Sequence, residues 1–268
     1  MSVPTSASPP LTYYPKASWH ARLHYAWWMV LFSMGLLLTG LLMLPLRLLP
    51  YRKAQPVIYA VFKAWAWWCQ RPAGLHIHWP EGKPPLPYPC VMVSNHRSQL
   101  DIQCARLAHD HPFQFVAKAE LGKIPFLGGI LRRYHILVDR KSIRSRGTAL
   151  ERMQQGLVSG HSIFAFVEGK RHPGPDLLGA FSAGAFQLAC SGPYPLAMLT
   201  LAGTGEKMPA AFHMLRGGKI YAWWDVMPAD QVARYRPREL RDEAQRCMHA
   251  RLKAYYDSRP FASMPSKP

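Results

Sequence analysis

Acidic side chains are scarce in this sequence. Its 268 residues include 15 Asp and Glu against 33 Lys and Arg, so the formal net charge is +18. A surplus of this size favours an anionic partner, such as a nucleic acid, a phospholipid surface or a phosphorylated substrate. The position of the cations relative to the apolar residues decides among the three.

Paired cysteines are lacking too. Five cysteines occur, with no C-x-x-C pair and no zinc-type spacing: Cys69, Cys90, Cys104, Cys190 and Cys247. This excludes a disulfide scaffold and predicts reduced thiols in a protein that faces the cytoplasm. His76 and His78 would share one face of a strand, but no carboxylate accompanies them, so we interpret them as strand residues and expect no metal site.

The sequence contains no G-x-S-x-G segment of the kind that carries a hydrolase serine, and no cysteine is placed as a nucleophile. This argues against a membrane-anchored hydrolase. Hydrophobic residues make up 49% of the chain and provide material for a sizeable core, which excludes a disordered protein.

One long apolar run is present. Residues 25–46 form a stretch of 22 residues without a formal charge, and a helix of this length can cross a hydrocarbon core of about 30 Å. Aromatic residues at one edge and cations at the other suit anchoring at the lipid headgroups. The run is longer than the apolar core of a cleaved signal peptide. We therefore expect a retained membrane segment, either a full span or a re-entrant one.

A second apolar segment, residues 57–69, contains Trp65, Trp67 and Trp68 and is too short to span. It fits a helix in the membrane interface, and the alternative is a buried helix of the soluble domain. These segments predict a membrane-anchoring helical hairpin within residues 1–71, after a disordered N-terminus. A single domain is expected at 72–258 and a disordered tail at 259–268.

Short apolar runs alternate with helical stretches beyond residue 71. The predicted strands are residues 75–79, 90–94, 113–117, 136–138, 162–167, 195–201 and 220–224, and the predicted helices lie near 98–109, 126–133, 143–159, 179–191 and 237–256. This alternation predicts an α/β fold, with a mostly parallel central sheet of about seven strands flanked by helices. Gly217 and Gly218 indicate a turn between two antiparallel edge strands.

The apolar run at residues 91–93 ends in a polar loop where His96 stands five residues before Asp101. Loops of this kind, between a strand and a helix, are where α/β folds usually build their sites. A carboxylate that keeps one ring nitrogen of a histidine protonated leaves the other nitrogen free to take a proton from a substrate hydroxyl. The alternative is a helix capping box of Ser98 and Asp101, with an ordinary loop histidine.

Cations occur at or near three further strand ends, at Lys118, Arg140 and Arg171. If they converge, they form a pocket suited to a phosphate monoester, which arginines can grip bidentately. Gly169 allows backbone to approach a ligand closely, and Glu168 can orient an arginine or a substrate hydroxyl. For each residue alone, the alternative is a solvated surface charge.

In this order the segments resemble the motifs of the glycerolipid acyltransferase family, typified by 1-acylglycerol-3-phosphate acyltransferase. The family's first motif, N-H-x-x-x-x-D, is matched by Asn95, His96 and Asp101. The second, K-x-E-L-x-x-x-P-x-x-G followed by an arginine, is matched by Lys118, Glu120, Leu121, Pro125, Gly128 and Arg140. The third, F-P-E-G-T-R, is matched by Phe166, Glu168, Gly169 and Arg171. The resemblance covers residues 91–203.

The resemblance implies transfer of a fatty acyl group from acyl-CoA or acyl carrier protein to the free hydroxyl of a lysophospholipid such as 1-acyl-sn-glycerol-3-phosphate. No other cofactor is implied. His96 is then the general base, oriented by Asp101, and the oxyanion donors are Lys118 or the backbone amides after Ser94. The implied substrate-binding residues are Lys118, Arg140, Glu168, Gly169 and Arg171, with Asn95, Arg133 and Lys170 as weaker candidates.

Two positions of the third motif depart from the family, because Val167 and Lys170 replace its proline and threonine. Lys170 leaves another acceptor open, such as a lyso-aminolipid. An enzyme of this kind is expected on a phospholipid membrane, at the inner membrane of a bacterium with the catalytic domain facing the cytoplasm. A basic membrane-associated nucleic-acid-binding protein is the rival class, but the cations follow apolar strands and the aromatics crowd the membrane segment, so no nucleic-acid partner is expected.

Overall fold

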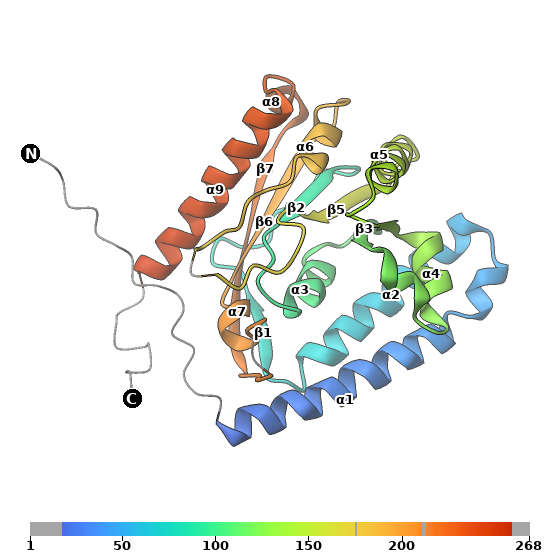
Figure 1. Ribbon diagram of the computed structural model, residues 1–268, viewed down its shortest axis with the longest axis vertical. Helices are drawn as coiled ribbons and strands as arrows, with labels where there is room; N and C mark the ends of the chain where they lie inside the picture. The colour runs from blue at the N-terminus through green and yellow to red at the C-terminus, as the bar shows by residue number, and fades with distance from the viewer. Residues whose placement is uncertain (1–17, 175, 211–212, 259–268) are drawn as a thin grey trace, which may run out of the picture.

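One sheet forms the centre of the fold. The computed structural model describes residues 18–174, 176–210 and 213–258, and its seven strands lie in the order β1-β7-β6-β2-β5-β3-β4 (Figure 1). The strands are β1 (Leu75–His78), β2 (Val91–Ser94), β3 (Phe113–Lys118), β4 (Ile136–Val138), β5 (Ser162–Phe166), β6 (Leu196–Ala202) and β7 (Gly218–Met227). Only the β6–β7 pair is antiparallel. The predicted α/β fold is confirmed, whereas the expected disorder of both termini falls on residues outside the described ranges.

The predicted helices are confirmed as α3 (Leu100–Ala108), α4 (Leu127–Tyr134), α5 (Ile143–Val158), α6 (Gly184–Ala189) and α9 (Pro237–Asp257). α6 begins later than expected because the amides before it have other partners. Gly179 donates its N–H to Glu168, and Ser182 donates to the carbonyl of Val167. Beyond residue 71, the sequence reading missed three short elements, η2 (Ala119–Lys123), α7 (Thr204–Lys207) and α8 (Ala229–Val232).

Both faces of the sheet are covered. Val91 and Val93 of β2 join a hydrophobic cluster with residues of α5, α6 and α9, while Met92 joins a second cluster with residues of α3. Alternate side chains of a strand point to opposite faces, so a strand between two helical layers is apolar at successive positions. All four residues of β2 are buried. This double burial explains the continuous apolar run that leads into the His96 loop.

The predicted turn at Gly217 and Gly218 is wrong. β7 begins at Gly218 and runs parallel to β1 on one side and antiparallel to β6 on the other. A Cβ on Gly217 would lie 3.2 Å from the carbonyl oxygens of Ala73 and Gly74, and the Gly218 N–H donates to the Gly74 carbonyl at 2.8 Å. The two glycines therefore serve a close backbone approach at the sheet edge, and no tight hairpin forms there.

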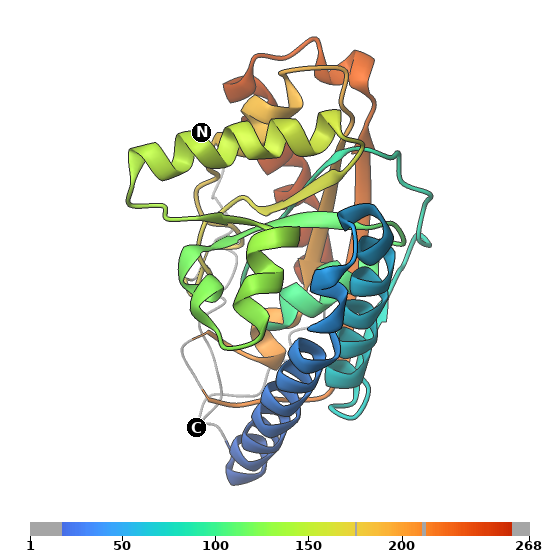
Figure 2. The same cartoon turned by 90° about the vertical axis from the view of Figure 1, so that its right-hand side faces the viewer.

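The N-terminal apolar segments form the expected helical hairpin. α1 (Trp19–Leu42) and α2 (Tyr51–Gln70) are joined by the 3-10 turn η1 (Pro45–Leu48), and Figure 2 shows the two helices side by side. Trp28 of α1 is fully buried, and its indole N–H donates to the carbonyl of Cys69 at 3.0 Å. α2 packs one face on α3 and leaves Trp67 and Trp68 exposed. The division between hairpin and domain at residue 71 stays a prediction.

An exposed apolar stripe runs along α1. Within the described ranges, Trp19–Leu48 is the one helical segment long and apolar enough to cross a membrane, with a mean hydropathy of 2.2. The exposed members of the stripe are Trp19, Leu23, Trp27, Val30, Met34, Leu37, Leu38, Leu41 and Leu42. Both ends of the helix rest on the domain, because Leu215 donates its N–H to the Ala21 carbonyl and Gly40 lies against Leu127. α1 therefore runs along the domain and does not project from it.

Candidate active site

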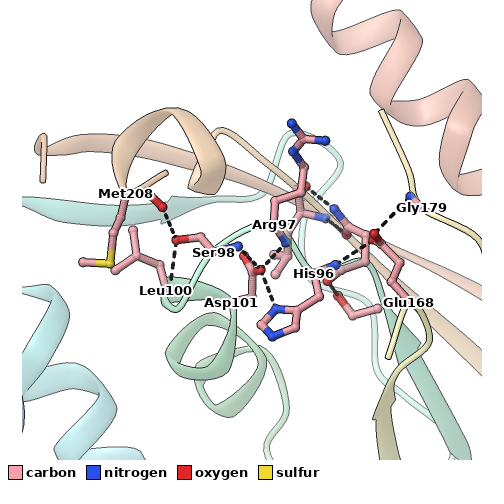
Figure 3. Close-up of polar contacts among 11 residues, drawn as sticks. His96, Arg97, Ser98, Leu100, Asp101, Glu168, Gly179 and Met208 are labelled. Carbon is pink, nitrogen blue, oxygen red and sulfur yellow. Dashed lines mark hydrogen bonds and ion pairs between the residues drawn. The ribbon is translucent and has the colours of Figure 1, made fainter. Parts of the chain in front are cut away.

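The loop after β2 brings His96 and Asp101 together. His96 Nδ1 lies 2.9 Å from Asp101 Oδ2, at the start of α3 (Figure 3). The Asp101 side chain is fully buried, while the His96 side chain is 15% exposed. A buried carboxylate at this distance accepts the Nδ1–H and leaves Nε2 as the basic nitrogen. The pair thus has the geometry of a general base with its orienting group.

Asp101, the second residue of α3, also binds the backbone just before that helix. Its Oδ2 accepts the backbone N–H groups of Arg97 and Ser98, each at 2.7 Å. The second of these bonds is the one that the acidic residue of a capping box makes to the N–H three positions earlier, whereas Gln99, the residue directly before α3, makes no side-chain capping bond. Ser98 Oγ in turn accepts the N–H of Leu100 at 3.2 Å. The two readings of this segment therefore coexist, because helix capping holds the carboxylate that faces His96.

Glu168 fixes the backbone of His96. Its Oε1 accepts the N–H of His96 at 2.9 Å, and its Oε2 accepts the N–H of Gly179 at 3.0 Å. Burial raises the pKa of this carboxyl above its ordinary value, and the two amide donors oppose that rise. The sequence led us to expect Glu168 on an arginine or a substrate hydroxyl. Instead it holds the His96 loop, because β5 lies beside β2 and the residues after both strands meet.

Three of the loop amides expected to stabilise an oxyanion already have acceptors. The N–H groups of His96, Arg97 and Ser98 all donate to carboxylates. These three amides are therefore engaged in this conformation, and the choice of oxyanion donors stays a prediction. Lys118 remains as the donor named from the sequence.

Asn95 ties the same loop to β6. Its Nδ2 donates to the carbonyl of Leu201 and its Oδ1 accepts the Leu201 N–H, both at 2.9 Å. The side chain is fully buried, so it positions the loop and does not face a substrate. The sequence reading missed two further supports. Arg97 donates to the carbonyls of Gly174 and Asp176, and His172 donates its backbone N–H to the His96 carbonyl at 2.8 Å.

The cations of the second and third motifs lie in one row along the sheet. The order β2-β5-β3-β4 places the loops that follow these strands side by side. Lys118, which ends β3, is level with Val138 of β4, two residues before Arg140. The Arg140 guanidinium lies over Gly169, since a Cβ built there would be 3.7 Å from it, and burial lowers the pKa of this arginine. Lys118 is 68% exposed and pairs with Glu120 at 3.0 Å.

Lys170 and Arg171 are both exposed after the end of β5. Gly169, just before them, has a φ of +72°, a value that side-chain-bearing residues rarely adopt. Its N–H donates to the Phe166 carbonyl at 3.1 Å. This turn directs the chain away from β5 next to Arg140.

Arg133 has a different partner from the one expected. Its guanidinium donates to the carbonyls of Arg47 and Leu49, on either side of the end of η1. These bonds tie α4 to the turn of the N-terminal hairpin. The geometry therefore does not support Arg133 as a phosphate ligand, which was a weaker expectation from the sequence.

The described residues contain no group of three or more His, Cys, Asp and Glu side chains that could hold a metal ion. His78 packs its ring edge-on against Tyr221, with centroids 5.1 Å apart.

The described residues form an α/β fold whose mostly parallel sheet carries, at the carboxyl end of β2, a histidine in contact with a buried aspartate. This fold resembles a solved structure, the 1-acyl-sn-glycerophosphate (LPA) acyltransferase PlsC of Thermotoga maritima. The TM-score is 0.68 at 18% sequence identity, over 90% of this chain and 96% of that one. At this identity the likeness shows a shared fold.

Sequence comparison relates part of the chain to a family. Residues 78–201 match the model of the family described as Acyltransferase. A chloroplastic 1-acyl-sn-glycerol-3-phosphate acyltransferase of Brassica napus is 35% identical over 130 residues, which are 48% of this chain and 37% of that protein. The 1-acyl-sn-glycerol-3-phosphate acyltransferase of Escherichia coli is 27% identical over 159 residues, 59% of this chain and 63% of that protein. The matched stretch thus spans about a third to two thirds of these relatives.

Proposed function

We propose that this protein transfers a fatty acyl group from an acyl thioester to the free hydroxyl of 1-acyl-sn-glycerol-3-phosphate, with phosphatidate as the product. The observation that carries the proposal is the 2.9 Å contact between His96 Nδ1 and the buried Asp101 Oδ2. The family match at residues 78–201 and the names of the relatives support acyl transfer and this acceptor. The donor is acyl-CoA or acyl carrier protein.

His96 Nε2 takes the proton of the acceptor hydroxyl as its oxygen attacks the thioester carbonyl carbon. Asp101 holds the imidazolium that forms, and general-base help of this kind contributes about 10²- to 10⁴-fold. The C–S bond then breaks, and the departing thiolate recovers the proton from His96. The acceptor oxygen attacks directly, so the sequence of steps needs no acyl-enzyme.

The acceptor phosphate binds beside His96, among the cations at the ends of β3, β4 and β5. Arg140, whose guanidinium lies over Gly169, is the best placed of them. Arg171 follows Gly169 on the loop after β5, and Lys118 ends β3, the strand between β5 and β4. Holding the phosphate orients the glycerol hydroxyl, which makes the attack effectively unimolecular. A lyso-aminolipid is the second candidate acceptor, because Lys170 stands where the family motif has threonine.

The hairpin keeps this site at a membrane. The apolar stripe of α1 faces away from the domain, while both helix ends are fixed to it. This geometry favours a helix that lies in the interface with its outer face in the lipid, over one that spans. The free cysteines, three of them buried, support a reducing compartment. We place the catalytic domain on the cytoplasmic side of a bacterial inner membrane.

The experiment is an assay of the full chain in detergent, with labelled acyl-CoA and acyl carrier protein against a panel of lyso-lipids. His96→Ala and Asp101→Asn are compared with the unchanged protein. Asparagine accepts the two loop amides but cannot hold His96 as an imidazolium, so we expect a loss of about 10²- to 10⁴-fold in kcat. Acyl transfer that survives in His96→Ala would overturn the role of the base. Activity confined to a non-phosphate acceptor would overturn the phosphate site and favour the lyso-aminolipid.

A further inference from the structure

A loop joins β5 to α6 and carries the cations of the third motif. Its described residues contain no helix or strand. The two ends of the loop meet, because Ser182 donates its N–H to the carbonyl of Val167 at 2.7 Å. A loop of this length whose ends lie together is an Ω-loop, a type of loop that is frequently functional. Lys170 and Arg171 are exposed on it.

His96 contacts the loop on both sides of these two cations. Before them, Glu168 Oε1 accepts the N–H of His96 at 2.9 Å. After them, His172 donates its N–H to the carbonyl of His96 at 2.8 Å. Lys170 and Arg171 therefore stay near His96 as long as both bonds hold. Their position relative to the proposed base depends on how firmly the rest of the loop is held.

The rest of the loop has few bonds of its own. Among the described residues 170–174 and 176–178, His172 alone makes a backbone–backbone hydrogen bond to another described residue. The carbonyls of Gly174 and Asp176 instead accept hydrogen bonds from Arg97, whose Nη2 and Nη1 lie 3.1 and 2.5 Å away. Hydrogen bonds from a charged donor are roughly twice as strong as neutral ones. The side chain of Arg97 is therefore the main attachment of this half of the loop.

Arg97 is rigidly placed for this role. The residue is 8% exposed, and its backbone N–H donates to Asp101 Oδ2 at 2.7 Å. Its charge also opposes the rise that burial causes in the pKa of Glu168. Gly205 of α7 makes room for the side chain, since a Cβ there would lie 3.3 Å from Arg97 Nε. The backbone of Arg97 thus binds the carboxylate that orients His96, while its side chain binds the loop with the cations.

We propose that Arg97 is a positioning residue for the acceptor, and that its side chain latches the loop that carries Lys170 and Arg171. This inference rests on the proposed function, in which Arg171 helps to bind the acceptor phosphate. A released loop adopts the binding arrangement for only a fraction of the time, and the apparent affinity falls by that fraction. Loss of the latch therefore raises KM for the acceptor. A substitution at Arg97 keeps the backbone N–H that binds Asp101, so kcat at saturating acceptor changes little.

Limited proteolysis of the full chain in detergent tests the latch without reference to catalysis. Trypsin cleaves after Lys170 and Arg171, and the cleavage rate follows the local opening of the loop. We expect both bonds to be cut about tenfold faster in Arg97→Met than in the unchanged protein. The bond after Lys141, which is also exposed, supplies a reference rate in each sample. The matched control is Arg234→Met, which removes an arginine with a 75% exposed side chain and should leave all these rates unchanged.

Steady-state kinetics test what the latch does for the reaction. With 1-acyl-sn-glycerol-3-phosphate as the varied substrate, we expect KM to be about tenfold higher in Arg97→Met. We expect kcat and the KM for the acyl donor to change less than about twofold. Arg97→Lys keeps the charge and can bond one carbonyl, so its KM for the acceptor should rise about threefold. This second variant protects the test against misfolding of Arg97→Met.

Unchanged cleavage after Lys170 and Arg171 in both variants overturns the latch. A fall in kcat with an unchanged KM for the acceptor overturns the positioning role, and so do equal rises in KM for both substrates. If the unchanged protein transfers no acyl group, the proposed function fails. The cleavage rates then still decide whether Arg97 holds the loop.

Discussion

The imidazole of His96 stacks on the ring of Phe166, with centroids 4.2 Å apart and planes at 18°. Phe166 ends β5, the strand next to β2, so the first and third motifs meet through these two rings. Asp101 fixes the Nδ1 edge of the imidazole, and Phe166 fixes the plane of the ring. Together these contacts fix the orientation of Nε2, which is the preorganisation that the proposed general base requires.

Replacing Phe166 by leucine keeps apolar volume but removes the flat support. Aromatic stacking is worth about 0.5 to 1.5 kcal/mol, so we expect kcat to fall about 2- to 10-fold, with KM little changed. Initial rates of acyl transfer measure this effect. Phe181→Leu is the control, because Phe181 stacks on Phe186 in the cluster on the other side of the sheet. Equal losses of kcat in both variants would reduce the role of Phe166 to general packing.

Glu168 gives a prediction about pH and stability. Its carboxyl has a raised pKa in the folded protein because of burial, against an ordinary value of 4.5. The native state therefore binds this proton more tightly than the unfolded state. Its contribution to stability is present below pH 4.5 and is lost as the pH rises through the folded pKa. The amide side chain of Glu168→Gln has no titratable proton, so this contribution is absent from the variant.

We expect the difference in the free energy of unfolding between the unchanged protein and Glu168→Gln to fall as the pH rises from 4.5 through the folded pKa of Glu168. Denaturant unfolding of both proteins at a series of pH values measures the difference. A difference that rises with pH would mean that the amides of His96 and Gly179 outweigh burial in setting the pKa.

Only glycine fits at position 128 of the second motif, because the backbone of Gly122 packs closely against it. A Cβ at this position would lie 2.1 Å from the carbonyl oxygen of Gly122, a backbone atom that cannot move aside cheaply. Gly128→Ala should therefore destabilise the protein by about 1 to 3 kcal/mol or more. Gly147→Ala is the matched control in α5, where a Cβ meets nothing within 4 Å. That change should stabilise by about 0.5 to 1 kcal/mol, and thermal unfolding of both variants tests the contrast.

The α1 stripe predicts how the protein binds membranes. Val30 and Leu37 are exposed on its outer face, at 62% and 51%. Changing both to lysine places charges in the apolar layer and should reduce co-sedimentation with phospholipid vesicles at least about tenfold, without lowering Tm. Val158→Lys on α5 starts from a valine of similar exposure, 76%, and should sediment as the unchanged protein does. Unaltered vesicle binding in Val30→Lys/Leu37→Lys would contradict an interfacial α1.

The strands and most helices could be predicted from the sequence because their signals are local. A run such as Val91 to Val93 is apolar at each position since helices cover both faces of its strand. Gly217 and Gly218 show where this reasoning fails. Glycine can indicate a turn or a close approach, and only the neighbouring backbone of Gly74 distinguishes the two.

The candidate site also has one part that the sequence predicts and one part that it does not. His96 and Asp101 stand five residues apart in one loop, so their spacing alone predicts that they meet, and the capping of α3 by Asp101 brings this about. Glu168 stands 72 residues from His96 along the chain. Its partners depend on the order of strands in the sheet, which no local pattern contains.

The sequence by itself determined the α/β alternation, the apolar hairpin and the histidine–aspartate pair, because each depends on residues within a few turns or strand positions of one another. Only the tertiary structure decided that Glu168 supports the His96 backbone, that Arg133 holds the hairpin, and that α1 lies along the domain. The sequence around a charged side chain does not show which distant carbonyl or amide it will contact in the folded protein. Long-range packing makes that choice, because a buried polar group must find a partner among the atoms that the strand order places beside it.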